Sequence, residues 1–259
     1  MKFSASRNKV ERAVKHIHDL NELLVSFARS NFYAVSVQEH HGINWVHVDV
    51  DRSAFPTIDA ALIIGDALHN LRSALDILYF QAMHETTGIT DHRTRFPIRE
   101  GRQELVVAIN GGLKEKGLAD NPSALAIRDV IVDVVKAYQA GNYTLWALHD
   151  MNIRDKHQLL IPVFDLMQFS DIRLEDDKKE VFWAAGQPYF TNDSCRFNLH
   201  RRGVITVKDK GHAATVIVFD VGVPLKNKAI LPALNEIAEC VTRTIDAFEA
   251  IRIVVSFSK

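Results

Sequence analysis

Hydrophobic residues recur at helical spacing through the N-terminal part of the chain. Apolar side chains three or four positions apart predict helices over residues 8–31, 57–85, 122–138 and 143–160. Asn121 followed by Pro122 is a favourable helix start, because Asn caps the first turn and Pro fits the first helical position. Gly111 and Gly112 are expected to break the stretch that precedes this start. This part of the chain is therefore predicted to be mainly helical.

A second pattern, in which apolar and polar residues alternate, marks the expected strands. Residues 32–37 and 46–50 alternate on either side of a turn that contains Gly42, which predicts a β-hairpin. After Pro162, short β-branched or aromatic segments separated by turn signals occupy residues 163–169, 181–184, 195–199, 204–207 and 215–221. The charged run at residues 175–180 is expected to be a solvated loop.

These patterns together predict an α+β protein that is mainly α. We expect a helical bundle over residues 1–162 with the β-hairpin near residues 32–50, then an antiparallel β layer over residues 163–223. An apolar stripe within residues 224–259 predicts a C-terminal helix that packs back on the bundle, so that the whole chain could form one compact domain. Strands and helices do not alternate regularly, which argues against a parallel sheet of the α/β type.

Composition and charge exclude several classes of protein. The chain has 259 residues, of which 47% are hydrophobic and 24% charged, as is ordinary for a globular protein with a substantial core. Lys and Arg total 31 and Asp and Glu total 32, so overall charge does not favour nucleic-acid binding, and no DNA specificity is predicted. Any nucleic-acid binding would therefore depend on a local basic patch.

The cysteines and the hydropathy bear on the compartment. Cys195 and Cys240 are too few for a disulfide framework and do not form a CxxC pair, so two reduced thiols are expected. No apolar run approaches the ~20 residues that span a bilayer, and the N-terminus lacks the apolar run of a signal peptide. We therefore predict a cytoplasmic protein with no membrane partner.

The predicted second helix carries an unusual polar cluster. With residues placed about 100° apart, one arc is apolar and the opposite arc holds Asp66, His69, Asn70, Arg72, Ser73 and Asp76. Leu62, Ile77 and Phe80 share that second arc above and below the cluster, so the cluster is expected in a buried or half-buried groove. A buried Arg72 would require a carboxylate partner, and Asp76 or Asp66 is the nearest along the helix.

The predicted fourth helix carries a matching set. His149, Asn152 and Lys156 interrupt an otherwise apolar face at spacings of three and four, and Asp155 and His157 flank that face. If the two polar sets face each other, Asp76 or Asp66 is expected to meet Lys156. Arg72 is then expected to meet Asp155.

Two interpretations of the facing polar sets remain open. One is a buried network of ion pairs and hydrogen bonds that fixes the helix register. The other is a site in which a histidine does acid–base chemistry while Arg72 or Lys156 holds an anion. A metal site is disfavoured, because no HExxH pair is present and both cations would repel a metal ion. No metal and no cofactor is predicted.

The polar helices also carry a family resemblance. The segment Gly-Asp-Ala-Leu-His-Asn-Leu-Arg-Ser-Ala-Leu-Asp at residues 65–76, Phe-Pro-Ile at residues 96–98 and the Asp-Lys-His at residues 155–157 resemble a group of uncharacterised bacterial proteins. More distantly, the helical core is similar to HEPN domains of toxin, defence and RNA-processing systems. Catalytic members of that family are dimeric, metal-independent ribonucleases with an Arg and a His on a late helix. Here Asn152 stands where that Arg is expected before His157.

The resemblance implies a function that can be stated residue by residue. A HEPN-like ribonuclease would use His157 or His149 as general base, with Arg72 and Lys156 stabilising the charge that develops on the phosphate. The surrounding network would comprise Asp66, His69, Asn70, Asp76, Asn152 and Asp155. The alternative is a non-catalytic dimeric binding module whose polar network is structural. The partners expected are a second copy of the chain and, for the ribonuclease, RNA.

Overall fold

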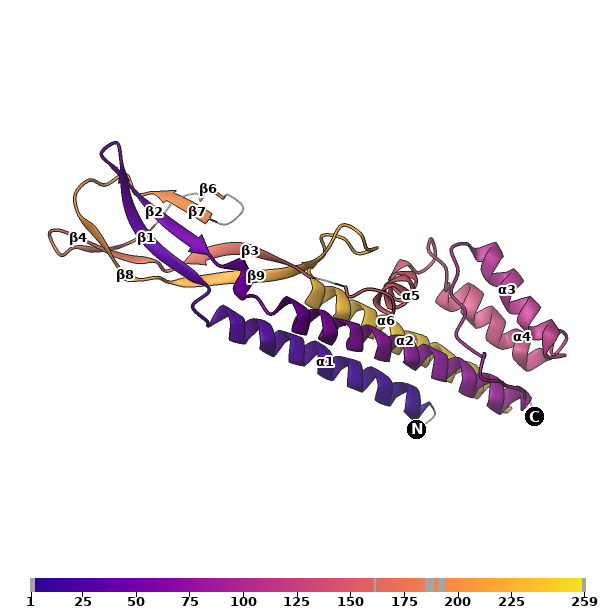
Figure 1. Ribbon diagram of the computed structural model, residues 1–259. Coiled ribbons are helices and arrows are strands. Elements are labelled where there is room, and N and C mark those ends of the chain that lie inside the picture. Colours follow the sequence, from indigo (N-terminus) through magenta and orange to yellow (C-terminus); the bar gives the residue numbers. More distant parts are fainter. Residues whose placement is uncertain (1–2, 161, 185–188, 191–193, 258–259) are drawn as a thin grey trace. The chain divides into compact units, whose positions relative to one another are not determined.

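The computed structural model describes residues 3–160, 162–184, 189–190 and 194–257 (Figure 1). The chain divides into two compact units. The helical unit comprises Met1–Leu20, Ile58–Pro162 and Phe219–Lys259, and the strand unit comprises Asn21–Thr57 and Val163–Val218. Each unit is thus assembled from segments that are far apart in the sequence, and the structure is of the mainly α, α+β class that the patterns predict.

Six α-helices and one π-helix supply the helical unit among the described residues. They are α1 (Ser4–Ala28), α2 (Thr57–Thr87), α3 (Arg102–Glu115), α4 (Pro122–Asp129), the π-helix η2 (Val130–Val135), α5 (Tyr143–Asp155) and α6 (Ile230–Phe257). The last turns of α1, from Asn21 onward, fall in the strand unit. Arg7 of α1 forms ion pairs with Asp246 and Glu249 of α6, at 2.7 and 2.9 Å, which hold these two long helices together.

Local chemistry accounts for several helix ends. The side chain of Asn121 accepts a hydrogen bond from the backbone N–H of Ala124 at 3.0 Å, and Pro122 opens α4, as the sequence predicts. Gly88, with φ +70°, follows the end of α2 in the left-handed region that glycine favours. The helix that α4 begins continues as η2 and stops at Lys136, which also adopts a left-handed conformation with φ 55°.

Two of the helix predictions are wrong. Gly111 and Gly112 do not break the chain but lie inside α3, where packing overrides their low helix propensity. The fourth predicted helix ends at Asp155 and does not reach residue 160, because the chain turns there before the first strand of the later segment.

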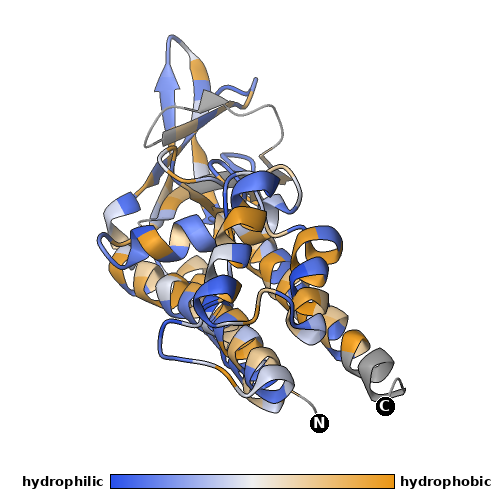
Figure 2. Ribbon diagram, turned by 90° about the vertical axis from the view of Figure 1, so that its right-hand side faces the viewer, coloured by the Kyte–Doolittle hydropathy of each residue, from blue (hydrophilic) through white to orange (hydrophobic). Residues whose placement is uncertain are grey.

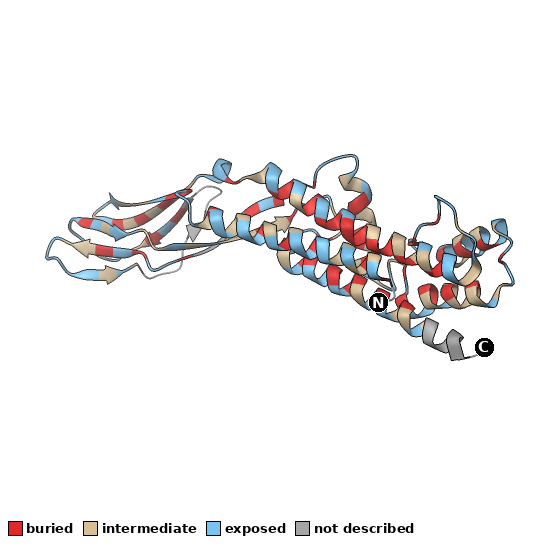
Figure 3. Cartoon of the chain, turned by 90° about the horizontal axis from the view of Figure 1, so that it is seen from below, coloured by how far each residue is buried: buried red, intermediate tan, exposed pale blue. Residues whose placement is uncertain are grey.

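The hydrophobic core of the helical unit follows the predicted faces. The apolar arc of α2 is fully buried, and Ile64, Leu68, Leu71, Leu75 and Leu78 are each 0% exposed. Figure 3 shows such buried residues recurring along the long helices, and Figure 2 shows hydrophobic and hydrophilic residues interleaved along them. In the described part of the chain, no helix is both long and apolar enough to cross a membrane.

The strand unit contains nine strands within the described residues. They are β1 (Tyr33–His40), β2 (Ile43–Val50), β3 (Pro162–Ser170), β4 (Arg173–Asp176), β5 (Val181–Trp183), β6 (Tyr189–Phe190), β7 (Ser194–Asn198), β8 (Ile205–Asp209) and β9 (His212–Phe219), with the 3-10 helix η1 (Arg52–Ala54). The predicted hairpin is present, and His41 and Gly42 form its turn with φ 52° and 77°. The region expected as a loop at residues 175–180 begins instead with the end of β4.

The strands form three small sheets. The hairpin pairs through β2 with β7, so the first sheet has the order β1-β2-β7-β6 and joins early and late segments of the chain. The other sheets are β3-β9 and β5-β4-β8. An aromatic cluster of Phe27, Phe32, Phe55 and Phe164 supports this unit, with ring centroids 4.5–6.0 Å apart.

Candidate functional site

A cavity of about 360 Å³ lies in the helical unit beside α2. Its walls come from α2, from the connector at residues 93–99 that follows α2, from α3 and from α5. The lining residues are Arg72, Tyr79, Met83, Arg93, Thr94, Arg95, Phe96, Pro97, Arg99, Ala108, Ile109, Gly112, Leu113, Lys116 and His149. This volume lies within the range that small-molecule sites occupy.

Arg72 is the buried cation of the cavity and is only 6% exposed. Its Nη2 donates to Asp76 Oδ1 at 2.9 Å and to the Phe96 carbonyl oxygen at 2.6 Å. Asp76 Oδ1 also accepts a hydrogen bond from the Phe96 backbone N–H at 2.9 Å. The predicted partnership of Arg72 with Asp76 is confirmed, and the pair fastens the connector to α2.

The connector is held from its other side as well. Arg99 N donates to the Ala137 carbonyl oxygen at 3.2 Å, and Gln139 N donates to the Glu100 carbonyl oxygen at 3.2 Å. These bonds tie the connector to the segment that follows η2. The cationic residues on the connector are thereby carried on a backbone that is anchored at two places.

Four further cations line the cavity together with Arg72. Arg93, Arg95 and Arg99 come from the connector and are exposed, whereas Lys116 follows α3 and forms an ion pair with Asp91 at 2.6 Å. Among the residues that line the cavity, none is a carboxylate. The cavity is therefore electropositive, and Asp76 and Asp91 at its margin offset only part of the charge.

The electrostatics of Arg72 reflect this surplus of cations. Burial lowers the pKa of the Arg72 guanidinium, Asp76 opposes that effect, and the charges of Arg95 and Arg99 lower the pKa further. The Nη1 atom of Arg72 is buried and has no hydrogen-bond partner among the described residues. A buried charged donor without a partner is costly.

His149 faces the same cavity from α5. Burial, together with the nearby charges of Arg72 and Arg99, lowers the pKa of His149 to about 4. The imidazole is therefore neutral at pH 7. Its Nδ1 atom is buried and, like Arg72 Nη1, has no partner within the described part of the chain.

The chemistry available in the cavity favours binding over proton transfer. Burial raises the pKa of the Tyr79 hydroxyl to about 12, so this group keeps its proton at neutral pH. His149 is the single imidazole in the lining and is neutral. The cavity thus offers several cationic donors for an anion, but no acid–base pair whose pKa values lie near pH 7.

Asp155 occupies a different place from the one predicted. Its carboxylate packs against the backbone of α2 at Gly65, where a methyl group on Gly65 would lie only 2.6 Å from Asp155 Oδ2. Arg72 lies two helical turns further along α2, and the predicted Arg72–Asp155 ion pair is absent. The small size of Gly65 admits the Asp155 carboxylate close to α2, a contact that helix periodicity alone does not reveal.

Asp155 lies in an acidic environment, in contrast to the cationic cavity. Burial raises the pKa of the Asp155 carboxyl, the Leu160 backbone N–H lowers it, the charge of Asp66 raises it and His69 lowers it. The Oδ1 atom of Asp155 is buried without a partner among the described residues. The polar sets of α2 and α5 do therefore face each other, with Asp155 near Asp66 and His69, and His149 near Arg72.

The remaining predicted residues do not join the cavity. Asn70 is buried on the α1 side of α2, where Lys9 Nζ donates to its Oδ1 at 3.1 Å. Asn152 is buried in α5, whereas Lys156 and His157 are exposed beyond the end of that helix. The predicted contact of Lys156 with Asp76 or Asp66 is not present. Ile153, which the same face included, is also 44% exposed, so the buried side of α5 is rotated toward Asp155.

Sequence reasoning missed the cations of the connector. Arg93, Arg95 and Arg99 lie close together around Phe96 and Pro97, a local basic run in a chain with almost no net charge. This run of arginines is visible in the sequence. Its position beside Arg72 could not be predicted, because a connector without regular structure has no periodicity that indicates which element it contacts.

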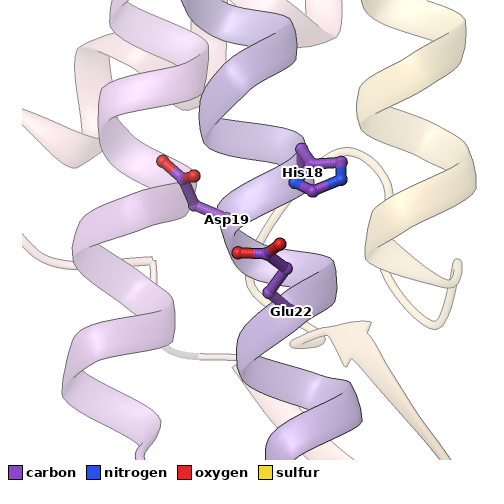
Figure 4. A group of neighbouring side chains, drawn as sticks. All are labelled: His18, Asp19 and Glu22. Carbon is purple, nitrogen blue, oxygen red and sulfur yellow. The ribbon is translucent and has the colours of Figure 1, made fainter.

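One group of potential metal ligands lies on α1. Ligand atoms of His18, Asp19 and Glu22 are within 4.8 Å of one another (Figure 4). His18 and Glu22 are exposed and Asp19 also approaches His16 at 3.8 Å. Because exposed acidic groups of this kind are common on helix surfaces, we assign no metal site to them.

Comparison of the chain with protein-family models, with curated proteins and with solved structures finds no match. The function is therefore inferred from the cavity itself.

Proposed function

We propose that this protein binds a small anionic ligand in the Arg72 cavity and acts as a binding module. The observation that supports this most directly is that the buried Arg72, one of whose nitrogens has no partner among the described residues, lines a cavity together with four other cations. An anion placed there would accept a charge-assisted hydrogen bond and would relieve the repulsion among the cations.

Asp76 alone does not neutralise the cations that line the cavity. Its side chain is 30% exposed, while that of Arg72 is 8% exposed, so the carboxylate remains partly solvated and neutralises a single cation. Arg95 and Arg99 act on Arg72 with the same sign of charge. Arginine is well suited to carboxylate and phosphate because its planar group donates in two directions, and among the described residues Nη2 of Arg72 has partners whereas Nη1 has none.

The ribonuclease hypothesis has less support from the site. His157 is exposed and is not part of the cavity wall, and His149, with its pKa lowered to about 4, is a weak base. His149 and Arg72 place a histidine beside an arginine, as that mechanism requires, but Lys156 and His157 are not among the lining residues. The binding module is the better-supported alternative.

Titration with inorganic phosphate tests the proposal. We expect calorimetry to detect binding to the wild-type protein and about tenfold weaker binding to Arg72→Lys, which keeps a charge beside Asp76 but loses the planar fork. Arg99→Gln should also weaken binding. Lys114→Gln is the matched control, since Lys114 is on α3, outside the cavity wall, and should leave the affinity unchanged.

Two results would contradict the proposal. The first is that phosphate does not bind, or that Arg72→Lys and Lys114→Gln lower the affinity for phosphate equally. Either result would mean that the cavity is not an anion-binding site. The second is cleavage of mixed RNA that persists with chelator and disappears in His149→Ala or His157→Ala, which would favour the ribonuclease. We expect RNA to stay intact.

The other expectations remain predictions. A homodimer, a cytoplasmic location and the resemblance to HEPN domains are consistent with a binding module, and Cys195 and Cys240 are free and buried. Sedimentation at several protein concentrations would test the dimer.

A further inference from the structure

Two adjacent glycines inside α3 call for a physical explanation. Gly111 and Gly112 lie in the interior of a helix, where glycine is unfavourable because the unfolded chain loses so much backbone freedom. Neither residue adopts a positive φ. Apart from the adjacent residues and the nearby backbone of α3 itself, a Cβ atom added to either glycine would meet nothing in the described chain within 4 Å. Neither backbone conformation nor packing within the chain therefore requires glycine at these positions.

The two glycines differ in what they face. Gly112 lines the cavity, whereas Gly111 is exposed and is not part of the cavity wall. The open space above Gly112 is consequently space of the cavity, and it leaves the backbone of α3 accessible to whatever the cavity holds. Glycine in a helix next to a ligand commonly serves this close approach to the backbone.

The lining of the cavity combines cationic and apolar residues. Ala108, Ile109 and Leu113 of α3 and Met83 of α2 contribute apolar groups, and the five cations lie in α2, the connector and Lys116. A ligand that uses both kinds of lining must have an anionic head and an apolar body.

The volume supports a ligand larger than a simple ion. A cavity of about 360 Å³ has the room of about twelve water molecules, if each takes about 30 Å³ as in the liquid. Inorganic phosphate, with its few non-hydrogen atoms, would fill only part of this volume and leave the rest to water. Water gains little against the apolar part of the lining, whereas an apolar group in its place would gain from burial.

We infer that Gly112 is a specificity-determining residue that admits the flat apolar body of a phosphate monoester, whose phosphate is held at Arg72. The inference rests on the proposed anion-binding function and adds the class of ligand. A phosphate monoester fits because its head can carry two negative charges, which suits the surplus of cations, and because its single ester bond leaves the body free to lie on α3.

Phenyl phosphate and inorganic phosphate are the probes that test this inference. In the wild-type protein, we expect phenyl phosphate to bind about tenfold tighter than inorganic phosphate, the gain of burying a small ring. Gly112→Leu should remove that preference by filling the space above α3, while the affinity for inorganic phosphate stays within about twofold. Gly111→Leu, the matched control, should keep both affinities.

Folding is checked separately from binding. Because both glycines are unfavourable in a helix, Gly111→Ala and Gly112→Ala should each raise the melting temperature measured by circular dichroism. Should Gly112→Leu fail to fold, Gly112→Ala provides the same test with a smaller group, and it should reduce the preference for phenyl phosphate partially.

The outcomes separate this inference from the proposed function. If inorganic phosphate binds and depends on Arg72, but the phenyl group adds no affinity or Gly112→Leu weakens both probes equally, the inference on Gly112 is overturned and anion binding stands. If neither probe binds to the wild-type protein, anion binding itself fails. A selective loss of phenyl phosphate in Gly112→Leu, absent in Gly111→Leu, supports the inference.

Discussion

The facing polar sets of α2 and α5 meet in two places with opposite properties. Near Gly65 the contact is tight and acidic, because the Asp155 carboxylate packs on the α2 backbone and lies near Asp66. Near Arg72 the contact opens on a cationic cavity, where His149 is neutral. Buried polar atoms without partners among the described residues occur at both places, and the cavity of about 360 Å³ adjoins the second.

The two places differ in what lies beside α2 and α5. At Arg72, the connector brings Arg95 and Arg99 to the helices and leaves a cavity against α3. At Gly65, no such volume separates the carboxylate from the backbone. Buried polar atoms of the same kind therefore stand in two different surroundings, one packed against the helix backbone and the other beside a cavity.

The largest effect is expected from removing the partner of Arg72. Asp76→Ala leaves a buried guanidinium without its carboxylate and the Phe96 N–H without its acceptor, so the free energy of unfolding should fall by about 3 kcal/mol. Urea denaturation measures this. Glu239→Ala, which breaks an exposed i,i+4 pair with Arg243, is the control and should cost less than about 0.5 kcal/mol. Equal losses in the two variants would mean that the Arg72 pair is effectively solvated.

The second prediction concerns pH at the cavity. The pKa of His149 is lowered from 6.5 to about 4 in the folded protein, so its contribution to stability is present above pH 6.5 and is lost as pH falls toward 4. Allowing for the partial exposure of the ring, the loss should be about 2 kcal/mol. His149→Gln should remove this part of the pH dependence, measured by urea denaturation across that range. His157→Gln, at an exposed histidine, should leave the profile unchanged.

Asp155 should show the opposite sign. Its pKa is raised in the folded protein, so its favourable contribution is present below the ordinary value of 3.8 and is lost as pH rises through the raised pKa. Asp155→Asn should therefore stabilise the protein at neutral pH relative to wild type, and the gain should vanish in acid. A variant that is less stable than wild type at pH 7 would contradict an environment that disfavours the charged form of this carboxylate.

A smaller loss is expected at Gly65. Gly65→Ala places a methyl group 2.6 Å from Asp155 Oδ2, and the strain should outweigh the better helix propensity of Ala, for a net loss of about 1 kcal/mol. In the Asp155→Ala background the same substitution should become stabilising. A double-mutant cycle by chemical denaturation would show this change of sign, and simple additivity would show that the two residues do not contact.

The smallest effect is expected at the two glycines inside α3. Gly111→Ala and Gly112→Ala should each add about 0.5 to 1 kcal/mol of stability, because neither methyl group meets a neighbour within 4 Å. Thermal denaturation of both variants sharpens the contrast with Gly65. Destabilisation by Gly112→Ala would mean that the space above α3 is smaller than the structure has it.

Local sequence determined much of the helical unit. The spacing of Ile64, Leu68 and Leu75 fixed the core face of α2, Asn121 and Pro122 fixed the start of α4, and the i,i+4 spacing fixed the pair of Arg72 with Asp76. These features depend on residues within a few positions of one another. Helical geometry alone relates such residues in space, so the pattern of the chain is sufficient to predict them.

Only the tertiary structure decided what surrounds Arg72. It carried α3 through Gly111 and Gly112, placed Asp155 on Gly65 rather than on Arg72, and brought Arg95 and Arg99 to the buried guanidinium. Each of these contacts joins segments whose separation in the sequence is bridged by irregular chain or by other helices. Periodicity cannot predict such contacts, because it shows which residues share a face of an element but not which other element that face packs against.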